Sequence, residues 1–138
     1  SPFRAAPDVF PPGNFNAGVL LFRPCPSLHS SCVGAVGAVA SYDRGDTGLL
    51  NALMPGWLMG SDNKLPFSLN AQRSALHMTS RRYWDAAGPA VVLHFSSTPK
   101  PWEGRPSGEL EVAFWGVWAE AQVWYGRPHS GAADVGKG

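Results

Sequence analysis

Hydrophobic residues form two continuous runs and one long helical pattern along the chain. The runs from Phe15 to Phe22 (FNAGVLLF) and from Ala90 to Ser96 (AVVLHFS) show no polar alternation, which predicts strands buried on both faces. Pro24 and Pro26 end the first run. From Glu109 to Tyr125, apolar residues recur at helical spacing, and this pattern predicts a C-terminal helix.

Shorter helices are predicted between these elements. Ser27 is placed to cap a helix that runs to about Ala40, although two glycines weaken that pattern. Asp46 is placed to cap a second helix, whose leucines form one apolar face before Pro55 ends it. One or two helical turns are expected around residues 81–87.

The hydrophobic pattern also indicates how the chain is organised. Residues 1–14 are rich in Pro and Gly and predict an extended lead-in, and the Gly-rich residues 127–138 predict a flexible tail. Residues 15–126 then form one α/β unit, a mixed sheet with flanking helices. Two predicted strands do not close a sheet, so we expect this unit to complete something larger.

Composition narrows the class of protein. The chain has 138 residues, 44% hydrophobic and 15% charged, which is typical of one globular domain. The net charge of +1 and the lack of a basic stripe argue against a nucleic-acid partner. No run approaches the roughly 20 apolar residues of a membrane span, and no signal-peptide pattern is present. Any membrane contact is therefore expected from segments outside this chain. Cys25 and Cys32, seven positions apart, are expected to be free thiols.

Two groups of polar residues in the first half of the chain could carry chemistry. Asn16 offers a donor and an acceptor, and Gly18 allows a ligand or backbone to approach closely; a simple turn into a strand is the alternative. Asp43 and Asp46 could bind sugar hydroxyls or assist a reaction. The alternative is that Asp46 only caps a helix while Asp43 pairs with Arg44.

Two further candidates lie in the second half. His94 stands inside an apolar strand, where an imidazole is either a hydrogen-bonded core residue or a metal ligand. Lys100 lies between Pro99 and Pro101 in a loop that also offers hydroxyls, and such a loop suits a phosphate. A solvated surface lysine is the alternative.

Four segments occur in an order that resembles a known family. FNAGVLLFRP, YDRGDTGLLNALMPGW, LPFSLNAQR and VVLHFSSTPKPWE, from Phe15 to Glu103, resemble the second half of the family 8 glycosyltransferases, the glycogenin-like group. GDTGLLNA, LPFSLNAQR, RYWDAAGP, HFSSTPKPWE and GELE resemble its plant-type inositol phosphorylceramide glucuronosyltransferase branch more closely. The resemblance implies the C-terminal portion of a GT-A (Rossmann-like) fold. It also implies Mn²⁺-dependent, retaining transfer from a UDP-sugar to a glycolipid or glycan.

The same resemblance implies a role for each candidate residue. It makes His94 a manganese ligand. It places the catalytic role on Asp46 and Asp43, and leaves open whether Asp46 is a nucleophile or an electrostatic stabiliser. The donor-binding residues that it implies are Asn16, Ala17, Asp43, Asp46, Thr47, Ser97 and Lys100.

The chain also departs from the family pattern. Ala17 and Thr47 stand where glycogenins have Ser and Gln, so the sugar contacts are expected to differ. The Asp-x-Asp motif that supplies the other manganese ligands does not occur in residues 1–138. One histidine does not make a metal site. We therefore expect a partial catalytic domain, whose activity in isolation is doubtful.

Three functions stay open at this stage. The first is transfer of a hexosyl or glucuronosyl group to a separate acceptor, in the Golgi if the plant-type branch is right. The second is a glycogenin-like glucosyltransferase, with a cytoplasmic location as the alternative. Tyr83 is the one tyrosine between Asn70 and His94 and lies in a segment shared with the plant-type branch, which favours a separate acceptor. The third is a non-catalytic remnant of the family.

Overall fold

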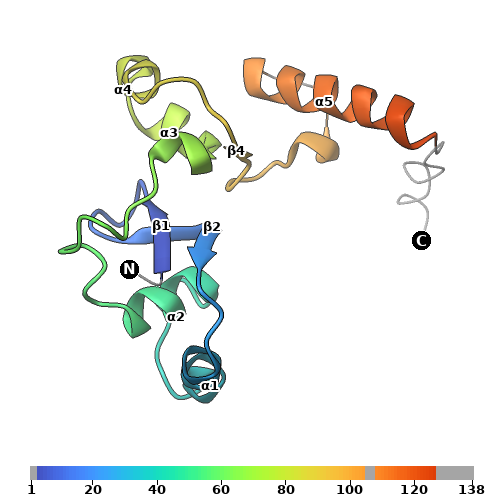
Figure 1. Cartoon of the computed structure of the whole chain (residues 1–138). Coiled ribbons are helices and arrows are strands. Elements are labelled where there is room, and N and C mark those ends of the chain that lie inside the picture. Colours follow the sequence, from blue (N-terminus) through green and yellow to red (C-terminus); the bar gives the residue numbers. More distant parts are fainter. Residues whose placement is uncertain (1–2, 105–107, 127–138) are drawn as a thin grey trace, which may run out of the picture. The chain divides into compact units, whose positions relative to one another are not determined.

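The computed structural model describes residues 3–104 and 108–126 (Figure 1). The chain divides into two compact units, Ser1–Ser97 and Thr98–Gly138, and each is described by itself. Two small sheets of two strands each, with helices beside them, build the first unit. The predicted mixed α/β class is therefore confirmed. The predicted tail, residues 127–138, lies outside the described residues.

The first sheet pairs β1 (Phe3–Pro7) with β2 (Phe15–Phe22) in antiparallel register, with an irregularity between Ala5 and Ala6. Residues 1–14 were expected to be only a lead-in, and this expectation is wrong for β1. Its residues Phe3, Ala5 and Ala6 are buried in the core. A strand this short is defined by its partner β2, which local composition does not reveal.

Strand β2 has the bounds that the sequence predicts, but its expected burial on both faces is wrong. Phe15 and Asn16 are buried at its start, whereas Leu21 is 56% exposed and Phe22 is 50% exposed at its end. The physical reason is that β1 is the neighbour of β2 in a sheet of two strands, so within the described residues no third strand pairs with β2.

The second sheet is parallel and very short. β3 (Ala71–Gln72) pairs with β4 (Leu93–His94), so that Gln72 lies opposite His94. The predicted buried strand over residues 90–96 is therefore shortened to two residues. Val91, before β4, does not take part in strand pairing. Its N–H donates to the carbonyl of Ser68, and Val91 is 70% exposed.

The described part of the first unit contains four α-helices, α1 (Pro26–Ala35) and α2 (Asp46–Leu53) between β2 and β3, and α3 (Arg73–Met78) and α4 (Arg81–Ala86) between β3 and β4. The cap of α1 is Cys25 and not Ser27, and the helix ends before Gly37, whose φ of 78° is left-handed. The cap of α2 is Gly45, which places Asp46 inside the first turn and corrects its predicted capping role. Both cysteines are free thiols, as predicted.

The second unit consists of the short 3-10 helix η2 (Pro101–Glu103) and helix α5 (Glu109–Tyr125). The bounds of α5 are those predicted from its spacing. The rings of Trp102 and Phe114 pack against each other with their centroids 5.9 Å apart, and this contact joins η2 to α5. Within the described ranges, no helix has the length and apolar character needed to cross a membrane.

The core of the first unit brings β1, β2 and α2 together. Phe15 lies between Phe3 and Trp57, with ring centroids 5.0 and 5.4 Å away. Asn51 of α2 bonds both backbone groups of Phe15: its Oδ1 accepts from the N–H at 3.1 Å and its Nδ2 donates to the carbonyl at 2.8 Å. This pair of bonds holds the start of β2 against α2.

Candidate functional site

A network of polar side chains lies where four elements of the first unit meet. It consists of Asp8, Asn16 of β2, Asn70 at the end of the 3-10 helix η1 (Phe67–Asn70), Gln72 of β3 and His94 of β4. Asn70 is fully buried and Gln72 is 2% exposed. Burying a side-chain amide destabilises the folded protein unless the amide is hydrogen-bonded. We call these five residues the Asn16–His94 network.

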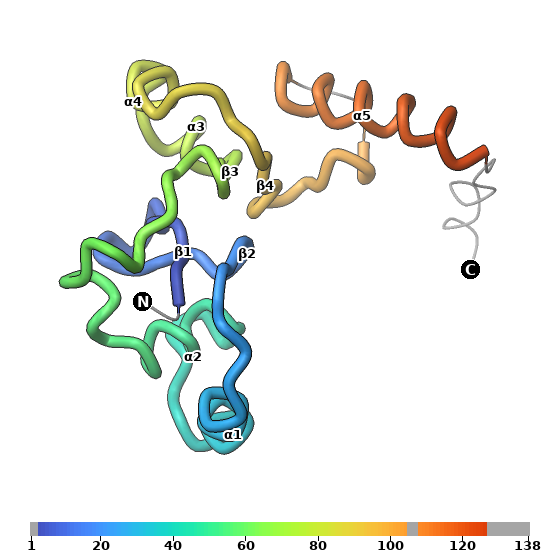
Figure 2. The backbone as a smooth tube through the Cα atoms, viewed as in Figure 1, coloured from blue at the N-terminus to red at the C-terminus, as the bar shows by residue number. Residues whose placement is uncertain are grey.

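The network is joined by short contacts between side chains. Asn70 Nδ2 donates to Asn16 Oδ1 at 2.9 Å, and Asn16 Nδ2 donates to Gln72 Oε1 at 3.3 Å. His94 Nδ1 lies 2.9 Å from Asn70 Oδ1. The segments β3 and β4 are labelled next to each other in Figure 2, and their parallel pairing places Gln72 opposite His94. Two of the predicted site residues, Asn16 and His94, are thus brought together.

Gly18 lies against the imidazole of His94. A Cβ atom at position 18 would be 2.3 Å from His94 Cε1 and 2.4 Å from Nδ1, distances that no side chain could tolerate without a shift. The N–H of Gly18 donates to Asn16 Oδ1 at 2.9 Å. The close approach expected at this glycine is therefore made by the histidine.

Thr47 connects the start of α2 to β2. The N–H of Ala17 donates to Thr47 Oγ1 at 3.2 Å, so two predicted donor-binding residues contact each other. Ala17 follows Asn16 directly in β2. The structure therefore places Ala17 and Thr47 beside the Asn16–His94 network.

Asp43 closes the turn that precedes α2. Its Oδ1 accepts from Ser41 Oγ at 2.6 Å and from the N–H groups of Gly45 and Gly48 at 2.9 and 3.0 Å. Burial raises the pKa of Asp43, but these hydrogen bonds outweigh it and hold the pKa below its ordinary value. Asp46 is exposed, as Asp43 is, and its carboxylate accepts from the N–H of Thr47 at 2.9 Å.

Replacing Asp43 with asparagine is expected to lower stability in a pH-dependent way. A depressed carboxyl pKa contributes stability above the unfolded pKa, and this stability is lost as pH falls through the folded pKa. We expect Asp43→Asn to cost about 1 kcal/mol at pH 7 and much less near pH 3. Urea unfolding of both proteins at the two pH values measures the difference. An equal difference at both values would contradict an ionised Asp43 as the source.

Ser97 is held by a residue that the sequence argument did not select. The Arg73 guanidinium, only 5% exposed, donates from Nη2 to the carbonyl of Ser97 at 2.6 Å and to its hydroxyl at 2.9 Å. The same guanidinium lies 5.4 Å from the centre of the Phe95 ring. Lys100 belongs to the second unit, where it caps the start of η2. Its backbone N–H donates to the carboxylate of Glu103, the last residue of η2.

Asn70, Gln72 and Arg73 are functional candidates that sequence reasoning did not name individually. All three lie in LPFSLNAQR, a segment quoted above for its resemblance to the family. The available signal was three polar side chains within four positions, Asn70, Gln72 and Arg73, after the mainly apolar residues 65–69. Their burial marks them as structural or binding residues and not as a solvated turn.

The described residues do not form a complete metal site. Within residues 3–104 and 108–126, no group of three or more His, Cys, Asp or Glu side chains is arranged to hold a metal ion. The partners of His94 in the network are amides, and amides do not replace the carboxylates that a manganese site uses.

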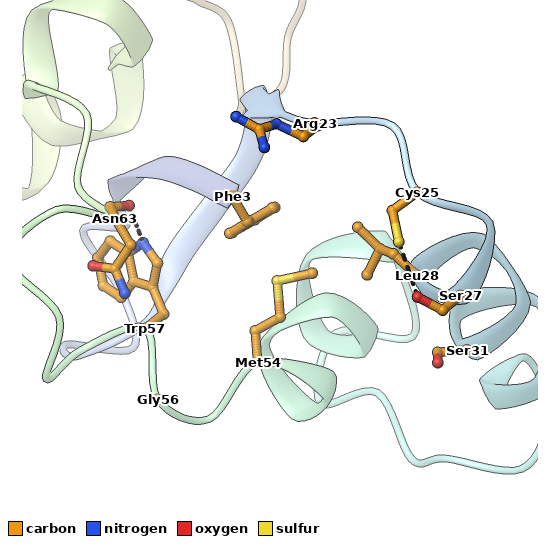
Figure 3. A pocket seen from close by; sticks show the side chains of 10 residues that line it. All are labelled: Phe3, Arg23, Cys25, Ser27, Leu28, Ser31, Met54, Gly56, Trp57 and Asn63. Carbon is orange, nitrogen blue, oxygen red and sulfur yellow. Dashed lines mark hydrogen bonds between the residues drawn. The ribbon is translucent and has the colours of Figure 1, made fainter. Parts of the chain in front are cut away.

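A separate pocket of about 460 Å³ opens beside the core (Figure 3). Phe3, Met54 and Trp57 line its apolar part, and Arg23 and Cys25 are among its more polar lining residues. Hydrogen bonds with Ser27 and with backbone groups of α1 lower the pKa of the Cys25 thiol. None of the predicted site residues lines this pocket, so it is distinct from the Asn16–His94 network.

Comparison with known proteins gives one consistent result. The chain is 33% identical to glycogenin-1 of Caenorhabditis elegans over 74% of its own length and 24% of the relative's. It is 34% identical to glycogenin-2 of Homo sapiens over 72% of its length and 20% of the relative's. The chain is homologous to part of a glycogenin. The glycogenin of Neurospora crassa agrees, with 32% identity over 75% of this chain and 15% of the relative's length.

The glycogenin similarity has clear bounds. The chain spans about a quarter or less of the length of these glycogenins. No family model matches the chain. The mixed α/β architecture is consistent with part of a GT-A glycosyltransferase, as expected from the sequence. The relatives support the glycogenin-like resemblance in general, and the plant-type branch remains a proposal.

Proposed function

We propose that the protein is a retaining glycosyltransferase that uses a UDP-sugar, and that this chain supplies part of its donor site. The observation that carries the proposal is the similarity to glycogenins over about three quarters of the chain. The geometry supports it, because Asn16, Ala17 and Thr47, expected at the donor, lie in one connected region with His94, expected as a metal ligand.

Within this proposal, the two aspartates have different tasks. Asp43 is engaged by three donors of its own turn, so we assign it to holding that turn. Asp46 is exposed in the first turn of α2 and is the better candidate for contact with the transferred sugar. A carboxylate there can accept sugar hydroxyls and stabilise positive charge that develops at the sugar ring.

The diphosphate end of the donor is proposed for the segment after β4. Ser97 and Lys100 would bind there, and Arg73 would fix Ser97 through its two bonds. Mn²⁺ dependence is part of the proposal, with His94 as one ligand. The remaining ligands would have to come from other parts of the protein, because the described residues offer no complete set.

Glucose is the first candidate for the transferred sugar, because the relatives are glycogenins. Glucuronate is the second, because several segments of the chain resemble the plant-type branch. Tyr83 lies on α4 and is 49% exposed, but its segment is shared with the plant-type branch, so we propose a separate glycan or glycolipid acceptor. A glycolipid acceptor would suit the Golgi, and a glycan acceptor a cytoplasmic location.

The test is a donor assay on the full-length protein. Radiolabelled UDP-glucose and UDP-glucuronate are offered separately, with and without Mn²⁺, and both UDP release and transfer to glucan or to ceramide-based lipid are measured. We expect Mn²⁺-dependent UDP release from one of the two donors. The absence of binding and release with both donors would favour the non-catalytic remnant.

Replacing Asp46 with asparagine is expected to reduce turnover on the order of 100-fold. Folding should be little changed, because Gly45 and not Asp46 caps α2. Asp62→Asn, at an exposed position of the loop before η1, is the matched control and should leave turnover unchanged. Thermal melting and turnover of both variants are compared with wild type. An Asp46→Asn protein with normal turnover would remove Asp46 from the sugar site.

A further inference from the structure

The orientation of the Asn16 amide is set by groups that can play only one role. The backbone N–H of Gly18 can only donate, and it lies 2.9 Å from Asn16 Oδ1. The carboxylate of Asp8, when ionised, can only accept, and its Oδ2 lies 3.1 Å from Asn16 Nδ2. Rotating the amide by half a turn would place donor against donor and acceptor against acceptor. Asn16 Oδ1 therefore faces Gly18.

Gln72 gives an independent reason for the same orientation. Its Nε2 donates to the carbonyl of Pro7 at 3.2 Å, and a carbonyl can only accept. The other end of the Gln72 amide, Oε1, must then face Asn16 Nδ2, as observed at 3.3 Å. The amides of Asn16 and Gln72 are therefore fixed from three separate anchors.

The orientation of the Asn16 amide determines that of Asn70, and Asn70 in turn contacts His94. Because Asn16 Oδ1 is an acceptor, the Asn70 atom 2.9 Å away must be the donor Nδ2. Asn70 Oδ1 then faces His94 Nδ1 at 2.9 Å. Asn70 is fully buried, so water does not offer its amide an alternative partner. An acceptor oxygen at this distance requires a proton on Nδ1.

We propose that Asn70 is a positioning residue that holds His94 as the Nδ1–H tautomer, with the lone pair on Nε2. A neutral imidazole binds a cation or accepts a proton through its unprotonated nitrogen, and the hydrogen bond at the other nitrogen decides which one that is. Gly18 fixes the plane of the ring by direct contact, and Asn70 fixes the proton. The use of Nε2 in transfer rests on the proposed function, whereas the tautomer does not.

The test measures the tautomer directly. The full-length protein is labelled with ¹⁵N in its histidines, and the ring signals of His94 are assigned by their loss in His94→Gln. At pH 8, above the ordinary imidazole pKa of about 6.5, wild type is expected to carry the proton on Nδ1. A proton on Nε2 in wild type overturns the proposal without any variant.

Three variants separate positioning from folding. Asn70→Leu removes the acceptor, so we expect a mixture of tautomers and transfer reduced by about 10-fold or more. Asn70→Asp keeps an acceptor for Nδ1 and should keep the Nδ1–H tautomer, although it loses the donor to Asn16 Oδ1 and should therefore melt lower than wild type. Asn51→Ala removes two bonds to the backbone of Phe15 and should lower the melting temperature without changing the tautomer. An unchanged tautomer in Asn70→Leu overturns the proposal. A wild type with the expected tautomer but no transfer would instead count against the proposed function.

Discussion

Replacing His94 with alanine is expected to reduce sugar transfer by the full-length protein by about 100-fold or more. The His94 imidazole can bind a cation or exchange a proton near neutral pH, and the amides of Asn16, Asn70 and Gln72 cannot take over that role. His77→Ala, at an exposed position of α3, is the matched control and should leave transfer unchanged.

The structural part of this effect can be separated from the chemical part. Removing the ring leaves Asn70 Oδ1 without its donor, and an unsatisfied buried acceptor costs about 1–3 kcal/mol. His94→Gln keeps an N–H donor that can reach this oxygen. We therefore expect His94→Gln to melt closer to wild type than His94→Ala while transfer stays low. A His94→Gln protein with normal transfer would make His94 a structural residue.

Replacing Gly18 with alanine is expected to have the second largest effect. The new methyl group would overlap the His94 ring, and the ring cannot move away without weakening its bond to Asn70. We expect a loss of about 1–3 kcal/mol of stability, as for overpacking, and transfer reduced by about 10-fold or more. Gly34→Ala in α1 is the control, because a Cβ there meets nothing within 4 Å.

The two glycine variants should change the free energy of unfolding in opposite directions. An alanine in the interior of α1 is expected to add up to about 1 kcal/mol, because glycine is the poorer helix former. Denaturant unfolding gives both stabilities, and the ¹⁵N ring signals of His94 report whether the imidazole has moved. If Gly18→Ala were as stable and as active as wild type, the contact between Gly18 and His94 would not exist in the working protein.

Local patterns predicted some of the fold well. The bounds of β2 and α5 agree with the sequence because an apolar run or a helical repeat defines each of them without outside help. The burial of β2 was mispredicted because burial depends on which elements cover a strand. β1 was missed for the same kind of reason, since five residues among prolines become a strand only through pairing with β2.

The candidate site was predicted in part, and through resemblance more than through local pattern. Asn16 was predicted to bind the sugar donor and His94 to bind the metal, and in the structure hydrogen bonds connect both of them to Asn70. Asn70 itself could not be selected, because a single buried asparagine has no periodicity that reveals its partner. The position of Gly45 as the cap of α2, next to Asp46, likewise depends on backbone angles that the sequence does not specify.

The contact between Gly18 and His94 limits how the sequence can diverge. A relative that acquires any side chain at the position of Gly18 must lose the imidazole, shrink it, or rebuild the β2–β4 neighbourhood. The two positions are therefore expected to change together, although they are 76 positions apart along the chain. A homologue that keeps the histidine but has another residue in place of the glycine would have to hold its imidazole in a different position. Homologues of that kind should be rare among those that transfer sugar.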